Sequence, residues 1–261
     1  MVEVSAAPVE TASRTEFVWA LVQREIRVRR KRAILGLVWP AIAPYFMLAI
    51  YTYIFHAVFH VQIPHYSLFL FAGLLPWTFF VQSLLTANTS ISEQSELIRR
   101  TPFPYELLPV SAVMSVAVFF LANTFLFTIY LLVNGELHPA MLLVLIVPLA
   151  TLALFTLGMS LILALIDVYN RDLRQILGNL LTIWFFLTPI VYRPNMAASW
   201  ASTFKSIDPM QVIIGEFRDV FIFGHVSYPA HYVEVLIAMI VFFLAAELVF
   251  RNLTTHLSAD V

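Results

Sequence analysis

The chain has 261 residues, of which 61% are hydrophobic and 12% are charged. Soluble domains carry about 25% charged residues, so this composition excludes an ordinary soluble protein and indicates an integral membrane protein. The net charge of -1 gives no reason to expect nucleic acid as a partner, and the absence of cysteine excludes disulfides and thiolate metal sites.

The N-terminal region contains a tail and a basic helix. Residues 1–14 are small and polar and are predicted to form a disordered cytoplasmic tail. Residues 15–36 are predicted to form an amphipathic helix in the membrane interface, with Arg24 and Arg27 on its polar face. Its apolar face comprises Phe17, Val18, Leu21, Val22 and Ile26. The apolar stretch that starts at Val38 lies too far from the N-terminus for a cleaved signal peptide.

Six apolar stretches follow in the rest of the chain, and we treat residues 15–261 as one transmembrane domain. A spanning helix needs about 20 residues, so the sequence predicts an all-α protein with six transmembrane helices. The fifth stretch is the shortest and ends in Thr188-Pro189. The stretches are Val38–Phe59, Tyr66–Leu85, Leu108–Val133, Met141–Ile166, Ile176–Tyr192 and Tyr232–Phe250.

The lysine and arginine distribution predicts the orientation. Twelve of these residues fall on one side of the six stretches and three on the other, which accounts for all 15. Cytoplasmic loops carry the excess of basic residues, so both termini, including the tail at residues 251–261, are expected in the cytoplasm. The three external basic residues are Arg193, Lys205 and Arg218.

A polar island, Ser90–Pro109, separates the second and third stretches. Ser90 and Glu93 have the spacing of a capping box, and Pro102 and Pro104 would end the resulting helix, so a short cytoplasmic helix is predicted at residues 90–104. Such a helix could dock with a soluble partner, and the alternative is a solvated loop. The polar candidates are Glu93, Glu96, Arg99 and Arg100, and the apolar docking candidates are Leu97, Ile98 and Phe103.

The long external loop at residues 193–231 contains an apolar helical segment, Met210–Phe223. Pro209 precedes this segment and Gly224 ends it. It is too short to span, so we expect a re-entrant or interfacial segment. Its embedded charged residues are Glu216, Arg218 and Asp219.

Several catalytic and ion-coupled functions are disfavoured. The only lysines are Lys31 and Lys205, and neither belongs to a Gly-Lys-Ser/Thr sequence, so the chain has no P-loop. We expect no catalytic site and no cofactor bound by this chain. The spans also contain almost no charge near their centres, where ion-coupled carriers and channels usually place it.

Two histidines, His56 and His60, have a spacing of four that can bind a metal. No carboxylate or cysteine completes the set, so we favour interfacial histidines and expect no metal site.

Four segments together carry a family resemblance. They are LVQREIRVRRKRAILGLVWPAIAP, ELIRRTPFPYELLP, DVYNRDLRQILGNLLTIWFFLTPIVY and DPMQVIIGEFRDVFI. In this order and spacing they resemble the permease subunits of type-2 ATP-binding-cassette exporters, in the branch that exports O-antigen, galactan, capsule, teichoic acid and related lipid-linked glycans. The chain departs from the family at Arg27–Arg32, which is more basic than usual, and at Tyr105, where the family often has arginine.

The resemblance implies a homodimer in the cytoplasmic membrane of a bacterium, with a pathway between two six-span halves. It implies two copies of a separate cytoplasmic ATPase subunit, which would bind ATP and Mg²⁺. It also implies that residues 90–104 are the coupling helix and that the substrate is a lipid-linked glycan. Two alternatives remain open, an exporter of a small hydrophobic molecule or lipid and a scaffold without a pathway.

Two groups of residues are candidates for handling such a substrate. The arginines Arg24, Arg27, Arg29 and Arg30 could bind its phosphate, because the planar guanidinium donates two hydrogen bonds at once; alternatively, they only set orientation and bind anionic membrane lipids. Aromatic rings could stack on sugar faces, or they could face lipid and neighbouring helices. The aromatic candidates are Trp39, Tyr45, Phe46, Tyr51, Tyr53, Trp184, Phe185 and Tyr192.

Overall fold

The computed structural model describes residues 14–32, 38–54, 65–94, 104–136, 141–192, 208–224 and 229–260. These residues form helices joined by turns. The elements are α1 (Arg14–Arg32), α2 (Val38–Thr52), α3 (Tyr66–Asn88), the 3-10 turn η2 (Ser92–Gln94), α5 (Leu107–Val133), α6 (Met141–Val144), α7 (Ile146–Tyr169), α8 (Leu173–Leu187), α10 (Pro209–Arg218), the π-helical turn η4 (Asp219–Phe223) and α11 (Pro229–Asp260).

Among the described residues, four helices are long and apolar enough to cross a membrane. They are Tyr66–Asn88, Leu107–Val133, Leu142–Tyr169 and Ala230–Thr254. Two shorter apolar helices, Ile42–Thr52 and Leu173–Leu187, correspond to the first and fifth predicted stretches. The structure thus agrees with an all-helical membrane protein, and four of the six predicted spans have full spanning length.

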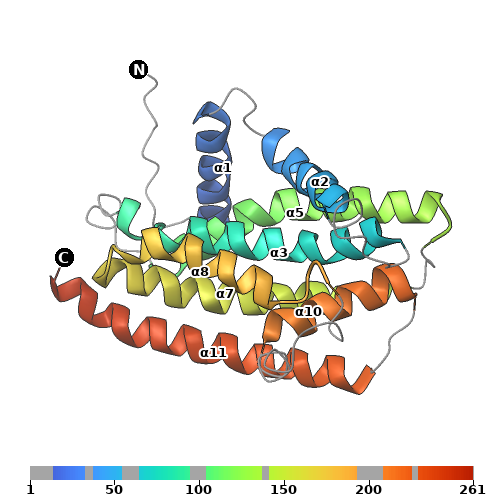
Figure 1. Cartoon of the computed structure of the whole chain (residues 1–261). Coiled ribbons are helices and arrows are strands. Elements are labelled where there is room, and N and C mark those ends of the chain that lie inside the picture. Colours follow the sequence, from blue (N-terminus) through green and yellow to red (C-terminus); the bar gives the residue numbers. More distant parts are fainter. Residues whose placement is uncertain are drawn as a thin grey trace.

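The long helices run along a common direction, and α1 lies across them (Figure 1). The end of α3, the turn between α7 and α8 and the end of α11 lie at one end of the bundle, which is the left end in the view. Helix α10 and the end of α5 lie toward the other end. Segments predicted to share a membrane side therefore share an end of the bundle.

Helix α3 forms the centre of the bundle and packs against α2, α5, α7, α8 and α10. Its sequence is apolar on all sides, as expected for a helix surrounded by other helices. Leu70, Phe80 and Leu84 are fully buried. The Phe80 ring stacks on Phe155 of α7, with 5.3 Å between the ring centroids. These contacts fix α3 more firmly than the peripheral helices.

Hydroxyl groups inside α5 are satisfied by their own helix. The side chains of Ser111 and Ser115 donate to carbonyls three residues earlier, and those of Thr124 and Thr128 donate to carbonyls four residues earlier. An unsatisfied hydroxyl would be costly in an apolar environment, so this local bonding lets polar residues occupy a spanning helix.

Helix α11 packs on α7 and leaves much of its apolar surface exposed. A Cβ atom at Gly158 of α7 would lie 2.7 Å from Cε1 of Phe242, so this close helix crossing requires glycine. Val233, Ile237 and Val241 lie among the exposed large hydrophobic residues. An exposed apolar face on a peripheral helix is the pattern expected for contact with lipid.

The structure corrects the predicted capping box. The Ser90 hydroxyl donates to the carbonyl of Ala87, and the amide of Glu93 donates to the carbonyl of Thr89. Ser90 is therefore part of the turn that ends α3, because it has a carbonyl acceptor three residues before it. The rest of the predicted coupling helix, residues 95–103, lies outside the described residues.

The predicted segment Met210–Phe223 is confirmed as helical. Pro209 is the first residue of α10, and the Asp208 carboxylate accepts a hydrogen bond of 3.0 Å from the amide of Met210. This is the arrangement expected of an N-cap followed by proline. Gly224 ends η4 with φ of 63°, a conformation that favours glycine.

Candidate translocation site

A cavity of about 310 Å³ lies between α2 and α8 and over α3. Aromatic rings and uncharged polar groups make up much of its lining, and none of the described residues that line it is Asp, Glu, Lys, Arg or His. The lining aromatic residues are Tyr51, Trp77, Phe185 and Phe186, and the polar ones are Thr78, Gln82 and Thr182. Such a surface can contact a neutral, hydroxyl-rich molecule without a strongly held ion pair.

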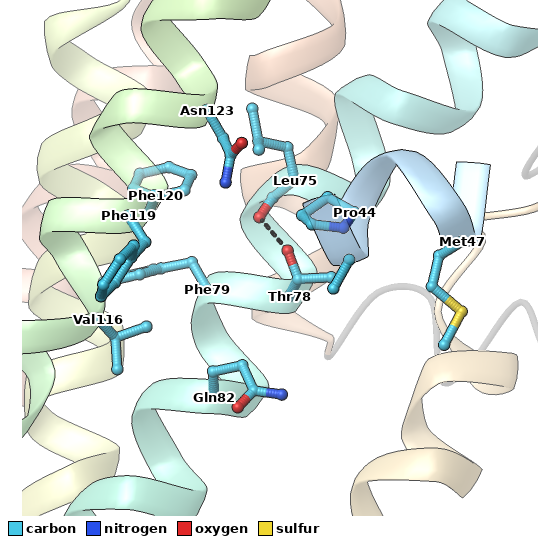
Figure 2. A pocket seen from close by; sticks show the side chains of 11 residues that line it. Pro44, Met47, Leu75, Thr78, Phe79, Gln82, Val116, Phe119, Phe120 and Asn123 are labelled. Carbon is cyan, nitrogen blue, oxygen red and sulfur yellow. Dashed lines mark hydrogen bonds between the residues drawn. The ribbon is translucent and has the colours of Figure 1, made fainter. Parts of the chain in front are cut away.

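A second cavity, of about 240 Å³, lies on the other side of α2, between α2, α3 and α5. Figure 2 shows Phe120 and Asn123 on α5 facing α3, with Pro44 of α2 on the other side. Thr78 and Gln82 of α3 line both cavities. Helix α2 therefore lies between two hollows and packs incompletely against the bundle.

One aromatic cluster joins the three helices around the first cavity. The rings of Tyr51 and Phe185 stack with 5.7 Å between their centroids. Trp77 of α3 lies 5.7 Å from Phe185 and 6.2 Å from Trp184, measured between ring centroids. The structure thus brings together three aromatic candidates from the first and fifth predicted spans, Tyr51, Trp184 and Phe185.

The remaining aromatic candidates have different surroundings. Phe46 and Tyr53 are 55% and 70% exposed on α2, and Tyr45 is partly exposed and contacts Phe71 at a centroid distance of 5.0 Å. The Tyr192 hydroxyl lies 3.1 Å from the carbonyls of Phe186 and Leu187, so it braces the end of α8. The side chain of Trp39 lies outside the described residues.

Asp208 ties α10 to the end of α8. Its carboxylate accepts hydrogen bonds from Trp184 Nε1 at 3.0 Å and from Thr188 Oγ1 at 2.7 Å, in addition to the amide of Met210. Trp184 is therefore held by the external segment as well as by the aromatic cluster. This role of Asp208 was not predicted from the sequence, although Asp-Pro before an apolar run is a recognisable start of a helix.

Arg218 fixes α10 in the bundle. Its side chain is 5% exposed and donates to the backbone carbonyls of Phe69 at 3.4 Å, Pro189 at 2.9 Å and Ile190 at 2.7 Å. The guanidinium carbon lies 3.6 Å from the centroid of the Phe69 ring. Burial lowers the pKa of the guanidinium to about 9, which leaves it protonated at neutral pH. A Cβ atom at Gly73 would lie 3.0 Å from Nη2 of Arg218, so α3 is closely fitted to this side chain.

The other two charged residues of the external segment face α11 and α7. Tyr232 of α11 donates to the carboxylate of Asp219 at 3.1 Å and lies 3.3 Å from the backbone carbonyl of Glu216. The Glu216 side chain is buried. Burial raises the pKa of its carboxyl to about 8; the Thr151 hydroxyl opposes this shift and the charge of Asp219 adds to it. The carboxyl is thus neutral in a large share of molecules at neutral pH.

The interfacial helix contacts the start of the polar island. Arg24 Nη1 donates to Gln94 Oε1 at 2.8 Å, and both residues line a cavity of about 210 Å³ with Glu93. Val22 is fully buried, so the predicted apolar face of α1 packs toward the bundle. Arg27 is exposed, and the side chains of Arg29 and Arg30 lie outside the described residues.

Among the coupling candidates, Glu93 is exposed on η2. The others lie outside the described residues: Glu96, Leu97, Ile98, Arg99, Arg100 and Phe103. The same holds for His56 and His60.

Comparison with known proteins identifies the family of this chain. A family model described as "ABC-2 type transporter" matches residues 16–222, which include nearly all of α1, the residues that line both cavities, and α10. The chain belongs to the ABC-2 type transporter family. This ABC-2 transporter chain is 31% identical over 218 residues to a Klebsiella pneumoniae protein named O-antigen export system permease protein RfbA, covering 83% of each chain. It is 33% identical over 205 residues to a Myxococcus xanthus protein of the same name, covering 77% of this chain and 78% of the relative.

Proposed function

We propose that this chain is the permease subunit of an ABC exporter that moves a lipid-linked polysaccharide across the cytoplasmic membrane. A separate ATPase subunit, present in two copies, supplies the energy and binds ATP and Mg²⁺. The observation that carries the proposal is the uncharged, aromatic-lined cavity between α2 and α8 in a chain of this family. The relatives named as O-antigen export permeases support the substrate class.

The cavity suits a sugar chain better than an ion. Ring faces contact the apolar faces of pyranose or furanose rings, and Thr78, Gln82 and Thr182 offer neutral hydrogen-bonding groups. Ion-coupled carriers instead place ionisable groups near the membrane centre. The polyprenyl tail of the substrate can remain in lipid, so the protein need only provide a path for the glycan and its phosphate.

A second copy of the chain would complete the pathway. Helices α2 and α8 border the cavity, and each also presents an exposed apolar face. Exposed large residues on these faces are Phe46, Ile50 and Tyr53 on α2 and Ile176, Leu180 and Ile183 on α8. In the proposed homodimer these faces contact the partner, and each half has six spans. Because α2 and α8 are shorter than the other spans, the lipid interface or the partner covers the rest of the membrane thickness at these two helices.

The basic face of α1 would receive the phosphate head of the substrate. Arg24 and Arg27 are exposed there, and arginine binds phosphate through two parallel hydrogen bonds. Arg29 and Arg30 follow in the same basic stretch of the sequence. In this arrangement the head enters beside α1 while the glycan reaches the cavity along α2.

The orientation that this function requires can be tested directly, because the chain has no cysteine. Cysteine in place of the exposed Asp172 should react with a membrane-impermeant maleimide only after the cytoplasmic face is opened. Cysteine in place of the exposed Glu136, at the opposite end of the bundle, should react in intact cells. The reverse pattern would overturn the proposed topology.

Coupling to the ATPase is tested by Leu97→Asp combined with Ile98→Asp. If these side chains insert into a cleft of the ATPase, their burial contributes about 1.5–3 kcal/mol each. The double variant should insert in the membrane, lose ATPase binding and stop export. Asn134→Asp, at the opposite end of the bundle, is the control. Unchanged export by the double variant would show that the island is only a loop.

Depletion of the protein tests the function as a whole. Finished glycolipid should accumulate on the cytoplasmic leaflet while its synthesis continues, and surface glycan should disappear. Normal surface glycan together with retention of a small hydrophobic compound would instead favour an exporter of a small hydrophobic molecule or lipid. A chain that never co-purifies with an ATPase and whose depletion leaves both pools normal would favour a scaffold.

A further inference from the structure

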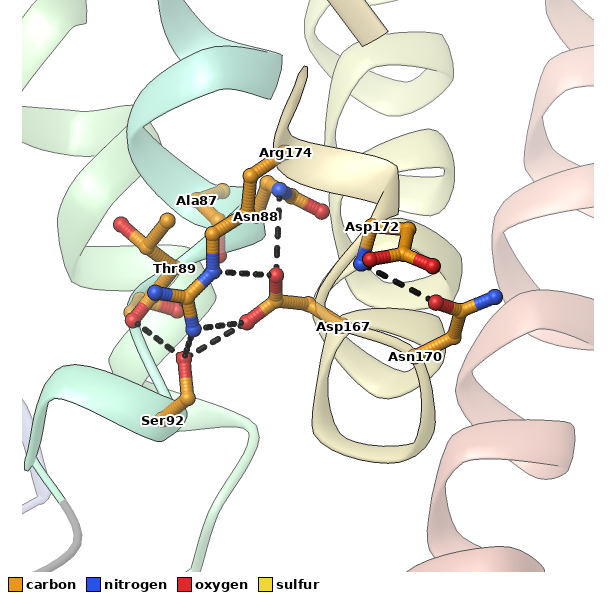
Figure 3. Close-up of polar contacts among 9 residues, drawn as sticks. Ala87, Asn88, Thr89, Ser92, Asp167, Asn170, Asp172 and Arg174 are labelled. Atoms are coloured by element: carbon orange, nitrogen blue, oxygen red, sulfur yellow. Dashed lines mark hydrogen bonds and ion pairs between the residues drawn. The ribbon is translucent and has the colours of Figure 1, made fainter. Parts of the chain in front are cut away.

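A polar cluster joins four elements at the end of the bundle where α3 and α7 end (Figure 3). Asn88 is the last residue of α3, Ser92 begins η2, Asp167 lies in the last turn of α7 and Arg174 lies in the first turn of α8. The Asp167 side chain is fully buried. A charged group in this position must be paired, because an unpaired buried carboxylate is strongly unfavourable.

The cluster is well connected. Arg174 donates from Nε to Asp167 Oδ1 and from Nη2 to Asp167 Oδ2, both at 2.7 Å, which is a bidentate pair. The Ser92 hydroxyl lies 2.6 Å from Asp167 Oδ2 and also accepts from Nη2 of Arg174. Asn88 Nδ2 lies 3.4 Å from Asp167 Oδ1. One carboxylate therefore fixes η2 against the turn between α7 and α8.

The position of Ser92 in the chain gives this contact a functional meaning. Ser92 lies just before the segment from Glu96 to Phe103, which the proposed function assigns to ATPase docking. On the other side of the cluster, Arg174 belongs to the helix that carries Thr182 and Phe185, which line the cavity. The cluster therefore connects η2, which directly precedes the docking segment in the sequence, to the helix that forms a wall of the proposed pathway.

Helix α8 is a better candidate for movement than α3. Helix α3 is surrounded by five helices, whereas α8 packs mainly on α3 and α7 and exposes Ile176, Leu180 and Ile183. A force on η2 moves the less restrained neighbour first. Since α8 is a continuous helix from Leu173 to Leu187, displacement of its first turn is carried to the cavity end.

We propose that the Asp167–Arg174–Ser92 cluster is the link through which movement of the ATPase-docking segment is passed to α8 and the cavity wall. This inference rests on the proposed function and adds positioning residues to it. Asp167, Arg174 and Ser92 do not line the cavity between α2 and α8, so they position other elements and do not contact the substrate. Breaking the cluster should separate ATP hydrolysis from export while both machineries stay intact.

Spin labels on the cysteine-free chain, bound to its ATPase in nanodiscs, test the link. One pair of labels replaces Glu93 on η2 and Gln175 on α8, both exposed; the second replaces Glu93 and Asn134 at the far end of α5. Pulsed electron resonance distances are measured without nucleotide and with the ATPase trapped by ATP and vanadate. The distance distribution between positions 93 and 175 should stay narrow and unchanged after trapping, while the distance between positions 93 and 134 should shift.

Asp167→Asn is the variant that breaks the link. The distribution between positions 93 and 175 should broaden. Glycan exported per ATP hydrolysed should fall about tenfold, which is the change in the equilibrium between connected and disconnected states expected for losing one charged hydrogen-bonded pair. Ser92→Ala, which removes only a hydroxyl, should act in the same direction to a smaller extent. Glu247→Gln is the control, because it removes the Arg251 ion pair within α11 and connects no elements to η2.

The outcomes separate the two proposals. A 93–175 distance that shifts as much as the 93–134 distance in the unmodified chain would overturn the link, and so would an Asp167→Asn variant that behaves like the control. If Asp167→Asn does not fold, Ser92→Ala decides by the same readouts. If the unmodified chain binds no ATPase, the proposed function fails; the width of the 93–175 distribution in the chain alone then still tests the link.

Discussion

Replacement of Arg218 by leucine should loosen α10 from the bundle. The change removes the donor for three buried carbonyls and the contact of the guanidinium with the Phe69 ring. The two shorter hydrogen bonds, to Pro189 and Ile190, are worth about 1.5–3 kcal/mol each because the donor is charged. A desolvated cation over a ring adds about 1–2 kcal/mol.

These contributions are partly offset, because burying the guanidinium itself costs several kcal/mol. We therefore expect Arg218→Leu to lower the free energy of unfolding by about 2–4 kcal/mol. For a chain of this size, such a loss corresponds to a fall in melting temperature of about 5–15 °C. Thermal unfolding in detergent micelles, followed by fluorescence-detected gel filtration, measures it.

The control is Arg251→Leu, because Arg251 is exposed and pairs with Glu247 within α11 and, at 4.0 Å, with Glu106. Exposed pairs contribute about 0–1 kcal/mol, so this variant should melt close to the unmodified chain. Gly73→Ala provides a second test, since its Cβ would crowd Arg218 Nη2. Its effect should be much smaller in an Arg218→Leu background, because the two sites are in contact. Equal melting temperatures for Arg218→Leu and Arg251→Leu would refute the reasoning.

Three further predictions concern other parts of the structure. The raised pKa of Glu216, about 8, means that the folded state favours the protonated carboxyl, so the free energy of unfolding should fall as the pH rises from about 4.5 to 8. In thermal melts, Glu216→Gln should remove this pH dependence, whereas the control Glu234→Gln should keep it. Gly158→Ala should lower the free energy of unfolding by about 1–3 kcal/mol, measured by the same melts, because its Cβ would lie 2.7 Å from the Phe242 ring. Asp208→Ala should cost about 1–3 kcal/mol and expose α10 to limited proteolysis, because it removes the helix cap and leaves buried donors unpaired; a protease pattern like that of the unmodified chain would contradict this.

The sequence alone predicted that this is a membrane protein and where its apolar helices lie. Runs of about 20 apolar residues need no tertiary context, because backbone hydrogen bonds in lipid must be satisfied within the helix. The external segment was also predictable, since Pro209 and Gly224 act through their own backbone conformations. The predicted capping box was wrong, because the spacing of Ser90 and Glu93 does not show which backbone group the Ser90 hydroxyl will bond. In the structure this hydroxyl donates to the carbonyl of Ala87, in the turn that ends α3.

The tertiary structure decided the polar contacts that hold these helices together. Asp167 meets Ser92 across 75 positions of sequence, and Arg218 meets the carbonyl of Phe69 across 149. Hydrophobic periodicity specifies which face of a helix is buried, but it does not specify which residues of another helix that face will meet. That choice depends on helix crossing and register, which arise only when α3, α7, α8 and α10 pack together.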